Sequence, residues 1–192
     1  MSKWTSLLAC TLLLSACGSS SGNSSTSSCK QQYWDGTLGV CLPATWKVLD
    51  RETLQSRGVP DEVTTAFQSS VVVSGQNPTV TVTKETLQGT IDSVSYSQAS
   101  IRSVASLPGY KLIDTRAVKI DGNDLELHVF SALPLPEEPE KRFYQLSSVS
   151  NGFGYTLTAL TPLSVSSSLE SEVLTIMRSL TFKDPAESSS AK

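Results

Sequence analysis

The strongest constraint on the fold comes from the second half of the chain. Two pairs of segments there alternate between apolar and polar residues, and a dipeptide typical of tight turns joins the members of each pair. Residues 112–120 and 125–130 flank Asp-Gly, and residues 143–149 and 153–160 flank Asn-Gly. These dipeptides tolerate the positive φ angles that a two-residue hairpin turn requires. The sequence therefore predicts two successive β-hairpins, separated by an exposed loop over the proline-rich and acidic residues 134–139.

Apolar residues at helical spacing mark two further segments, residues 90–107 and 167–179, which we expect to be helices. Residues 78–86 alternate between valine on one face and threonine on the other, and this pattern is typical of a strand. Shorter elements are expected at residues 60–67 (helix), 71–73 (buried strand) and 180–182 (closing strand). Helices combined with hairpins predict an α+β fold, in which helices pack on an antiparallel sheet.

The start of the chain has the pattern of a targeting segment. Lys3 precedes a short apolar run that ends at Leu14, and this run is too short to span a bilayer as a helix. Residues 1–16 are therefore interpreted as a secretory signal peptide. The sequence Leu14-Ser15-Ala16-Cys17 resembles the lipobox of bacterial lipoproteins, which implies acylation of Cys17 by a diacylglyceryl group and often by a further chain such as palmitate. Cys10 is a weaker match, and an ordinary cleaved signal without lipid is the alternative.

Residues 17–28 contain the expected lipidated cysteine and a linker of mostly Ser and Gly, which cannot bury enough apolar surface to become ordered. Two or more acyl chains hold a protein on a membrane stably, so the predicted partner of this end is a membrane. Ser19 instead of Asp resembles the sorting rule for the outer membrane, which would place the protein in the cell envelope, facing the periplasm in a Gram-negative host. Residues 184–192 are expected to form a polar tail.

Residues 29–183 remain for one domain. Cys29 and Cys41 are the two cysteines left in what would be an oxidising compartment, so we predict a disulfide that closes the loop between them. Closing such a loop contributes about 3 kcal/mol on the chain-entropy model. A redox pair is the alternative, but it usually requires Cys-x-x-Cys at the start of a helix, and the spacing here is longer.

Short motifs between residues 39 and 183 resemble the PsbP-like superfamily, which includes the Ran-binding Mog proteins and many bacterial lipoproteins. The motifs are Pro-x-x-Trp ending at Trp46, Leu-Pro-Gly-Tyr ending at Tyr110, the strand Gly154-Tyr-Thr-Leu-Thr158, and a helix that ends in Arg-Ser-Leu-Thr-Phe182. The resemblance implies an αβα sandwich and mostly non-catalytic binding or assembly roles. It implies no shared catalytic residues, and the loop between Cys29 and Cys41 departs from the common pattern.

The charge and the scarcity of catalytic motifs disfavour several functional classes. The net charge of −3 argues against nucleic acid as a partner, because nucleic acid requires a basic surface. His128 is the only histidine, so we predict no zinc site and no other metal or cofactor. Outside the Ser- and Gly-rich linker, the chain lacks the Gly-x-Ser-x-Gly elbow, and we expect no catalytic residues. A hydrolase that uses His128 with a serine stays a minor alternative.

Aromatic residues in and beside the predicted disulfide loop are the candidate binding residues: Tyr33, Trp34 and Trp46. The alternative is a purely structural role, in which these rings pack onto the domain. We therefore predict a non-enzymatic, membrane-anchored envelope lipoprotein that binds or helps to assemble another envelope component. The alternative is a protein that binds a small ligand in a pocket between sheet and helix.

Overall fold

The structure is a computed structural model that describes residues 29, 31–135 and 137–184. The predicted signal peptide, the lipidated Cys17, the linker and nearly all of the predicted tail lie outside the described residues. Within those ranges, no helix combines the length and hydrophobicity that a membrane span requires.

Two antiparallel sheets form the framework. The larger sheet has seven strands in the order β3-β4-β5-β9-β8-β7-β6, and the smaller sheet pairs β1 with β2. Every pairing between neighbouring strands is antiparallel. The strands are β1 Gln31–Trp34, β2 Gly39–Leu42, β3 Trp46–Leu49, β4 Val63–Ser69, β5 Thr79–Thr86, β6 Lys111–Ile120, β7 Asn123–Ala132, β8 Lys141–Ser150 and β9 Phe153–Pro162.

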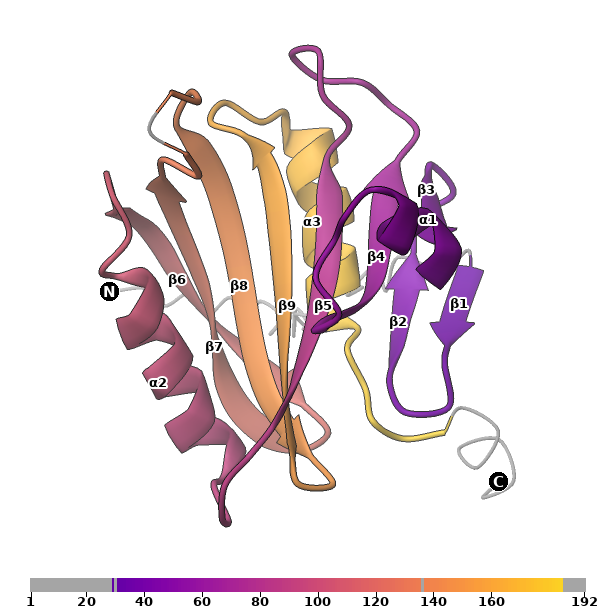
Figure 1. Cartoon of the computed structure of the whole chain (residues 1–192), viewed down its shortest axis with the longest axis vertical. Coiled ribbons are helices and arrows are strands. Elements are labelled where there is room, and N and C mark those ends of the chain that lie inside the picture. Colours follow the sequence, from indigo (N-terminus) through magenta and orange to yellow (C-terminus); the bar gives the residue numbers. More distant parts are fainter. Residues whose placement is uncertain (1–28, 30, 136, 185–192) are drawn as a thin grey trace, which may run out of the picture.

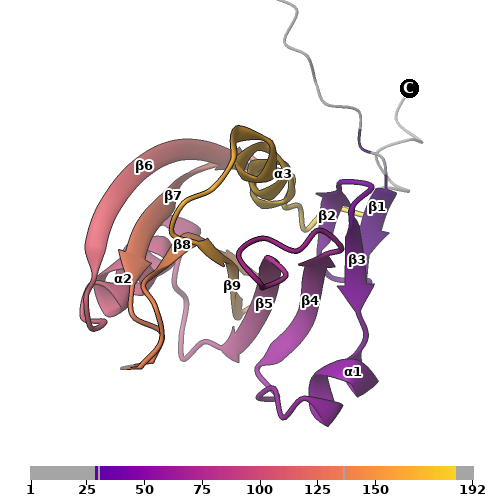
Figure 2. The ribbon, with the colours of Figure 1, turned by 90° about the horizontal axis from the view of Figure 1, so that it is seen from above.

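Two helices cover opposite faces of the large sheet, which Figures 1 and 2 show from the front and from above. Helix α2 (Ser93–Val104) lies on β7 and β8, and helix α3 (Ser167–Arg178) lies on the other face near β6 and the small sheet. The short helix α1 (Arg51–Ser56) lies beside β4. The predicted α+β class, with helices on both faces of an antiparallel sheet, is confirmed.

The main core lies between the large sheet and α3. Side chains that α3 buries there include Val173, Ile176 and Met177, each fully shielded from solvent. They pack against strand residues such as Leu157 and Val82. Burial of one such side chain contributes about 1.5–3 kcal/mol, so this face supplies most of the hydrophobic stabilisation.

Both predicted hairpins are present as β6–β7 and β8–β9. Asp121 and Gly122 have φ of 49° and 98°, as a two-residue turn of the hairpin type requires, and Asn151-Gly152 has the same character. Asp121 also holds the C-terminal segment, because its carboxylate accepts hydrogen bonds from the Thr181 hydroxyl at 2.8 Å and the Phe182 amide at 2.6 Å. In place of the closing strand predicted at residues 180–182, Thr181 forms a single β-bridge with Gly39.

The helix predicted over residues 60–67 is wrong, since this segment begins strand β4, which pairs with both β3 and β5. The helix lies earlier, at α1, where the Asp50 carboxylate caps the Thr53 amide at 2.7 Å. The strand predicted at residues 71–73 is also wrong. Val71 and Val72 are 50% and 60% exposed, and they belong to the turn between β4 and β5.

The disulfide between Cys29 and Cys41 is present and closes the β1–β2 hairpin. The Asp35 carboxylate accepts hydrogen bonds from the amides of Thr37 and Leu38 at 2.8 and 2.9 Å, which forms the turn predicted at Asp35-Gly36. The Cys41 amide donates to the Ser179 hydroxyl at 2.7 Å, so the hairpin is attached to the end of α3.

Candidate functional site

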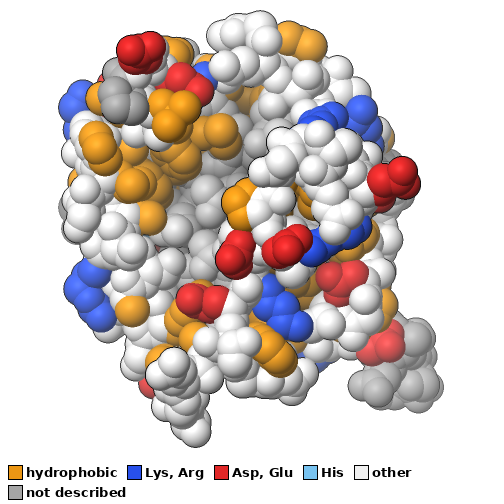
Figure 3. Space-filling view, in the orientation of Figure 1, with side chains coloured by type: hydrophobic (Ala, Val, Ile, Leu, Met, Phe, Trp, Pro, Cys, Tyr) orange, Lys and Arg blue, Asp and Glu red, His pale blue; other side chains and the backbone are white. Residues whose placement is uncertain are grey.

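A groove of about 440 Å³ opens on the α2 side of the large sheet, between α2 and β5. Figure 3 shows a hollow near the centre of this face, with acidic side chains along its border. We call this the α2 groove. Its lining consists of Glu62, Thr83, Lys84, Glu85, Tyr96, Ala99, Ser100, Ser103, Gln145, Thr156 and Thr158.

Inner strands of the sheet make the floor of the α2 groove. Across β8, β9 and β5, Gln145 pairs with Thr158 and Thr158 with Thr81. Each of these strands is hydrogen-bonded to a neighbour on both sides, so the backbone groups of the floor are already paired. Only side chains are therefore offered to whatever enters the groove.

Hydroxyl groups dominate the lining, and several bond to one another. The Ser147 hydroxyl lies 2.8 Å from the Ser100 and Thr156 hydroxyls, and it thereby joins β8, α2 and β9. Hydrogen bonds of this kind contribute about 0.5–1.5 kcal/mol each. They fix the distance between α2 and the floor.

Tyr96 carries the firmest contact between α2 and the strands. Its hydroxyl donates to Glu85 Oε1 at 2.5 Å, and it lies 3.4 Å from the Thr156 hydroxyl. Burial of the ring, together with the bond to Glu85, raises the pKa of Tyr96 to about 12. Gly154 leaves room for this ring, because a Cβ there would lie 2.6 Å from the Tyr96 hydroxyl oxygen.

Gln145 differs from the other floor residues. It is only 8% exposed, and its side-chain oxygen Oε1 is buried without a hydrogen-bond partner among the described residues. Leaving such an acceptor unpaired costs about 1–3 kcal/mol. Because Gln145 also lines the α2 groove, a donor supplied from the groove would remove this cost.

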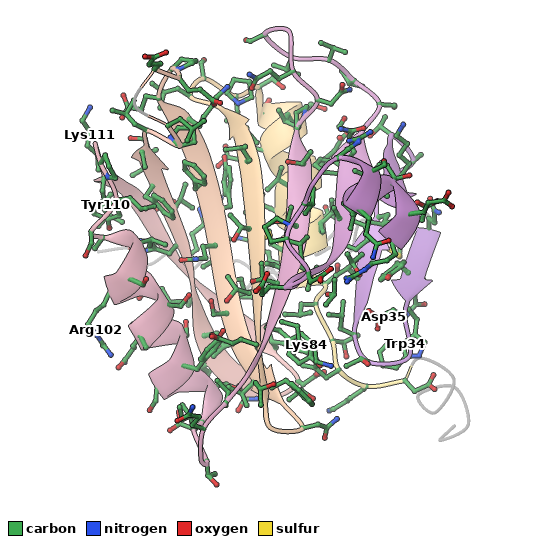
Figure 4. All side chains as sticks on the ribbon, viewed as in Figure 1. Trp34, Asp35, Lys84, Arg102, Tyr110 and Lys111 are labelled. Atoms are coloured by element: carbon green, nitrogen blue, oxygen red, sulfur yellow. A yellow bond between two sulfur atoms is a disulfide. The ribbon has the colours of Figure 1, made fainter. Side chains whose placement is uncertain are left out.

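The charge of the α2 groove is acidic. Glu62 and Glu85 contribute carboxylates, and both residues are solvent-exposed. Lys84 touches the lining too, but its ammonium lies 3.9 Å from the centre of the Phe153 ring. The two carboxylates therefore outnumber the single ammonium at the groove. Figure 4 labels Lys84 low on this part of the sheet and shows Arg102 pointing outward from α2.

His128, the residue of the hydrolase alternative, is 3% exposed and lies beside an aromatic cluster that contains Tyr110 and Phe130. Its Nε2 shares a hydrogen bond of 2.8 Å with the Tyr110 hydroxyl. Its Nδ1 lies 3.6 Å from Glu126 Oε1. Burial lowers the pKa of His128, against a smaller raising effect of Glu126. The hydroxyl bonded to His128 thus belongs to a tyrosine, not to a serine nucleophile.

The three candidate binding residues have different surroundings. Trp46 is 2% exposed and donates from Nε1 to Glu172 at 2.8 Å, so its ring packs in the core. Tyr33 is half-buried, with its ring against Phe67 at 5.1 Å and its hydroxyl 3.2 Å from Thr65. Trp34 is half-buried beside the hairpin turn, where Figure 4 labels it. These contacts correspond to the alternative in which the rings pack onto the domain.

A larger groove of about 750 Å³ lies between the disulfide and α3, and its charged residues are largely paired. Arg116 bonds to Asp114 at 2.6 Å and to Glu170 at 2.8 Å. These partners raise the pKa of Arg116, with Asp114 as the main cause. For metal binding, the described part of the chain holds no group of three His, Cys, Asp or Glu side chains. We therefore take the α2 groove as the candidate site.

Sequence reasoning missed every residue of the α2 groove. One sequence feature could have pointed to the groove. Residues 78–86 carry threonine at every second position, which indicates a strand with one polar face. The apolar spacing of the following helix pointed to the wrong face, because Val94 is 44% exposed while Tyr96 and Ser97 are buried.

No protein-family model matches the chain, and no curated protein matches it by sequence. Solved structures do match its fold. Cyanobacterial PsbP (CyanoP) from Synechocystis sp. PCC 6803 is 15% identical with a TM-score of 0.55, and the match covers 80% of this chain and 92% of CyanoP.

LpqN of Mycobacterium tuberculosis, described as involved in cell envelope biogenesis, has the same identity and TM-score over 80% of this chain and 90% of its own. A Mog1 variant is 10% identical with a TM-score of 0.52, over 82% and 97% of the two chains. Likeness at these identities establishes the fold alone. The chain has the PsbP-like fold that its sequence motifs predicted.

Proposed function

We propose that this protein is a lipid-anchored, non-catalytic binding protein of the cell envelope, and that the α2 groove is the surface with which it holds another envelope component. The observation that carries the proposal is the buried, unpaired oxygen of Gln145 in the lining of the groove. A buried acceptor without a partner costs stability, and a ligand that donates to it recovers that cost.

The non-catalytic part of the proposal is supported by how the reactive side chains are engaged. His128 is shielded from solvent and bonded to Tyr110. Glu85, a possible acid or base in the α2 groove, accepts a bond from Tyr96. A general base needs access to the substrate and a free acceptor atom; His128 lacks the access, and one oxygen of Glu85 is already bonded to Tyr96.

The envelope part of the proposal is supported by the sequence Leu14-Ser15-Ala16-Cys17. A Cys17→Ser variant tests it, because it removes the sulfur that would carry the lipid. We expect the wild-type protein to sediment with membranes and Cys17→Ser to stay in the soluble fraction or to accumulate with its signal peptide uncleaved. Equal amounts of processed protein in the membrane fraction for both would contradict lipid anchoring.

The binding part is tested by photo-crosslinking in cells. Ser103 lies on the α2 wall of the groove and is exposed, and Gln55 is an exposed residue on α1 outside the groove. A photoreactive amino acid at position 103 should give light-dependent adducts with one envelope component, whereas position 55 should not. Absence of adducts at position 103, or identical adducts at both positions, would refute the α2 groove as the binding surface.

A small-ligand-binding protein is the second candidate, and the volume of about 440 Å³ favours it, because it falls within the usual range of ligand pockets. The same crosslinking separates the two candidates. A macromolecular component shifts the mass of the adduct visibly on a gel, and a small ligand changes the mass only in a spectrometer.

A further inference from the structure

We propose that the ligand of the α2 groove is a neutral saccharide segment, recognised through its hydroxyl groups. This inference rests on the proposed function, in which the α2 groove is the binding surface, and it adds the chemical class of the ligand. It follows from four properties of the lining: its charge, its polarity, its paired floor and its acceptors.

The charge of the lining opposes anionic ligands. Glu62 and Glu85 place two carboxylates at the groove, against the single ammonium of Lys84, which lies over the Phe153 ring. A phosphate or carboxylate in the groove would therefore meet two like charges against one opposite charge. Neutral or donor-rich ligands meet no such repulsion.

The polarity of the lining opposes lipid chains. The side chains that line the groove are mostly hydroxyl-bearing, and apolar side chains on the same face, such as Phe130 and Phe143, lie outside the lining. An acyl chain in the groove would desolvate hydroxyls and the Gln145 amide without replacing their hydrogen bonds, which is unfavourable. A ligand that carries its own hydroxyls replaces them.

The floor opposes an extended peptide that binds as an added strand. Strand addition needs an exposed sheet edge with unpaired backbone groups. The floor strands β5, β9 and β8 are all internal to the sheet. A ligand in the α2 groove is therefore recognised by side chains alone. A sugar fits this mode of binding, because it has no peptide groups that could pair with a strand.

The acceptors of the lining match a polyol. Among the described residues, Gln145 Oε1 is buried without a hydrogen-bond partner, and Glu85 accepts a hydrogen bond from Tyr96 through Oε1, so its second oxygen can accept one from a ligand. The backbone of Glu62 is held against β5, because the Glu62 carbonyl accepts a hydrogen bond from the Lys84 amide at 2.8 Å. Three acceptors in one groove suit a ligand that carries several adjacent hydrogen-bond donors. Each hydroxyl group of a sugar can donate to one of these acceptors and can also accept a hydrogen bond from the Ser103 or Thr158 hydroxyl.

The experiment uses the detergent-solubilised full chain and isothermal titration calorimetry with four probes: maltotetraose, the tetrasaccharide of N-acetylglucosamine, tetraglycine and inorganic phosphate. We expect at least one tetrasaccharide to bind, and tetraglycine and phosphate not to. The preferred tetrasaccharide identifies the source of the sugar chemistry, a plain glucan or an N-acetylated amino-sugar chain.

Gln145→Leu is the decisive variant, because it keeps the approximate volume and removes the acceptor. We expect it to weaken saccharide binding about tenfold, the effect of one lost hydrogen bond at its upper range. Its thermal stability should equal or exceed that of the wild type, because a buried unpaired acceptor is removed, so a loss of binding cannot be ascribed to unfolding. Gln32→Leu makes the same change on exposed strand β1 and should leave binding unchanged.

Saccharide binding that survives in Gln145→Leu, or binding of phosphate or tetraglycine in place of both tetrasaccharides, overturns the inference. Failure of all four probes overturns it as well. None of these results alters the crosslinking at position 103, so the inference can fail while the proposed function stands. Loss of that crosslinking, in contrast, refutes the proposed function itself.

Discussion

Replacing Gly154 by Ala tests how the α2 wall is held against the sheet. Gly154 lies in β9, where alanine is otherwise acceptable, and in the absence of any contact the change would stabilise the protein by about 0.5–1 kcal/mol. The new Cβ, however, would lie 2.6 Å from the hydroxyl oxygen and 2.7 Å from Cε2 of Tyr96. Real Cβ atoms do not approach other heavy atoms so closely, so the ring or the strand must move.

The magnitude follows from what that movement breaks. Tyr96 is 8% exposed, and its hydroxyl donates to the Glu85 carboxylate at 2.5 Å. A hydrogen bond to a charged group contributes about 1.5–3 kcal/mol, and overpacking a well-filled site costs about 1–3 kcal/mol. Because relief of the overlap and loss of the bond are partly alternative responses, we expect Gly154→Ala to lower the free energy of unfolding by about 2–4 kcal/mol.

Urea denaturation followed by circular dichroism measures this change, and a double-mutant cycle with Tyr96→Leu assigns its cause. In the Tyr96→Leu background the ring is absent, so Gly154→Ala should be neutral or slightly stabilising. A single Gly154→Ala variant within about 0.5 kcal/mol of the wild type would refute the close approach of α2, since that is the range of ordinary surface changes. The same destabilisation in both backgrounds would refute the role given to Tyr96.

Three further predictions concern stability and titration. Cys29→Ser with Cys41→Ser should lower the free energy of unfolding by about 3 kcal/mol, and adding reductant to the wild type in urea should reproduce this loss. Because burial lowers the pKa of His128, the unfolded state binds more protons than the folded state when the pH is near or below 6.5, the ordinary pKa of histidine. The free energy of unfolding should therefore fall as the pH drops through that region. His128→Leu should reduce the dependence of the urea midpoint on pH. Because Tyr96 has a pKa of about 12 against an ordinary 10, its contribution to the free energy of unfolding should be complete below pH 10 and lost as the pH rises through 12. Phenolate absorbance titrations of the wild type and of Tyr96→Phe, compared with each other, give the pH at which Tyr96 ionises.

The elements that the sequence predicted correctly are those whose signals are local. Asp121-Gly122 and Asn151-Gly152 require positive φ at two successive residues, and that requirement holds in any tertiary setting. Helix α3 combines a Ser166 cap, which accepts from the Leu169 amide at 3.2 Å, with a single apolar stripe. In both cases the residues that select the local structure also build the packing.

The elements that the sequence predicted wrongly are those in which local signals conflict with pairing. Pro60, Asp61 and Glu62 look like the start of a helix, yet the next residues are β-branched and pair on both sides as strand β4. Pairing of β4 with β3 and β5 outweighs a weak helix-start signal. The three valines at 71–73 are apolar and β-prone, but they fall in a turn whose direction is set by the pairing of β4 with β5.

The α2 groove could not be predicted, because its existence depends on which face of a helix meets which part of a sheet. The apolar spacing of residues 90–107 suggested a helix that buries Val94 and Ile101. In the structure α2 buries Ser93, Tyr96 and Ser97 instead. The sheet face beneath it is polar, so the helix turns its small and hydroxyl-bearing side toward the sheet.

The two faces of the large sheet therefore contribute differently to the protein. On the α3 side, residues such as Leu157 and Ala159 are completely buried and supply hydrophobic stabilisation. On the α2 side, the same strand presents Thr156 and Thr158, whose hydroxyls contribute about 0.5–1.5 kcal/mol per bond where an aliphatic side chain would contribute about 1.5–3 kcal/mol by burial. A sequence that served stability alone would make both faces apolar and would not leave Gln145 Oε1 buried without a partner among the described residues. A polar face contributes less to the stability of the fold than an apolar face would, and the saccharide that we propose as ligand would recover part of this difference as binding free energy.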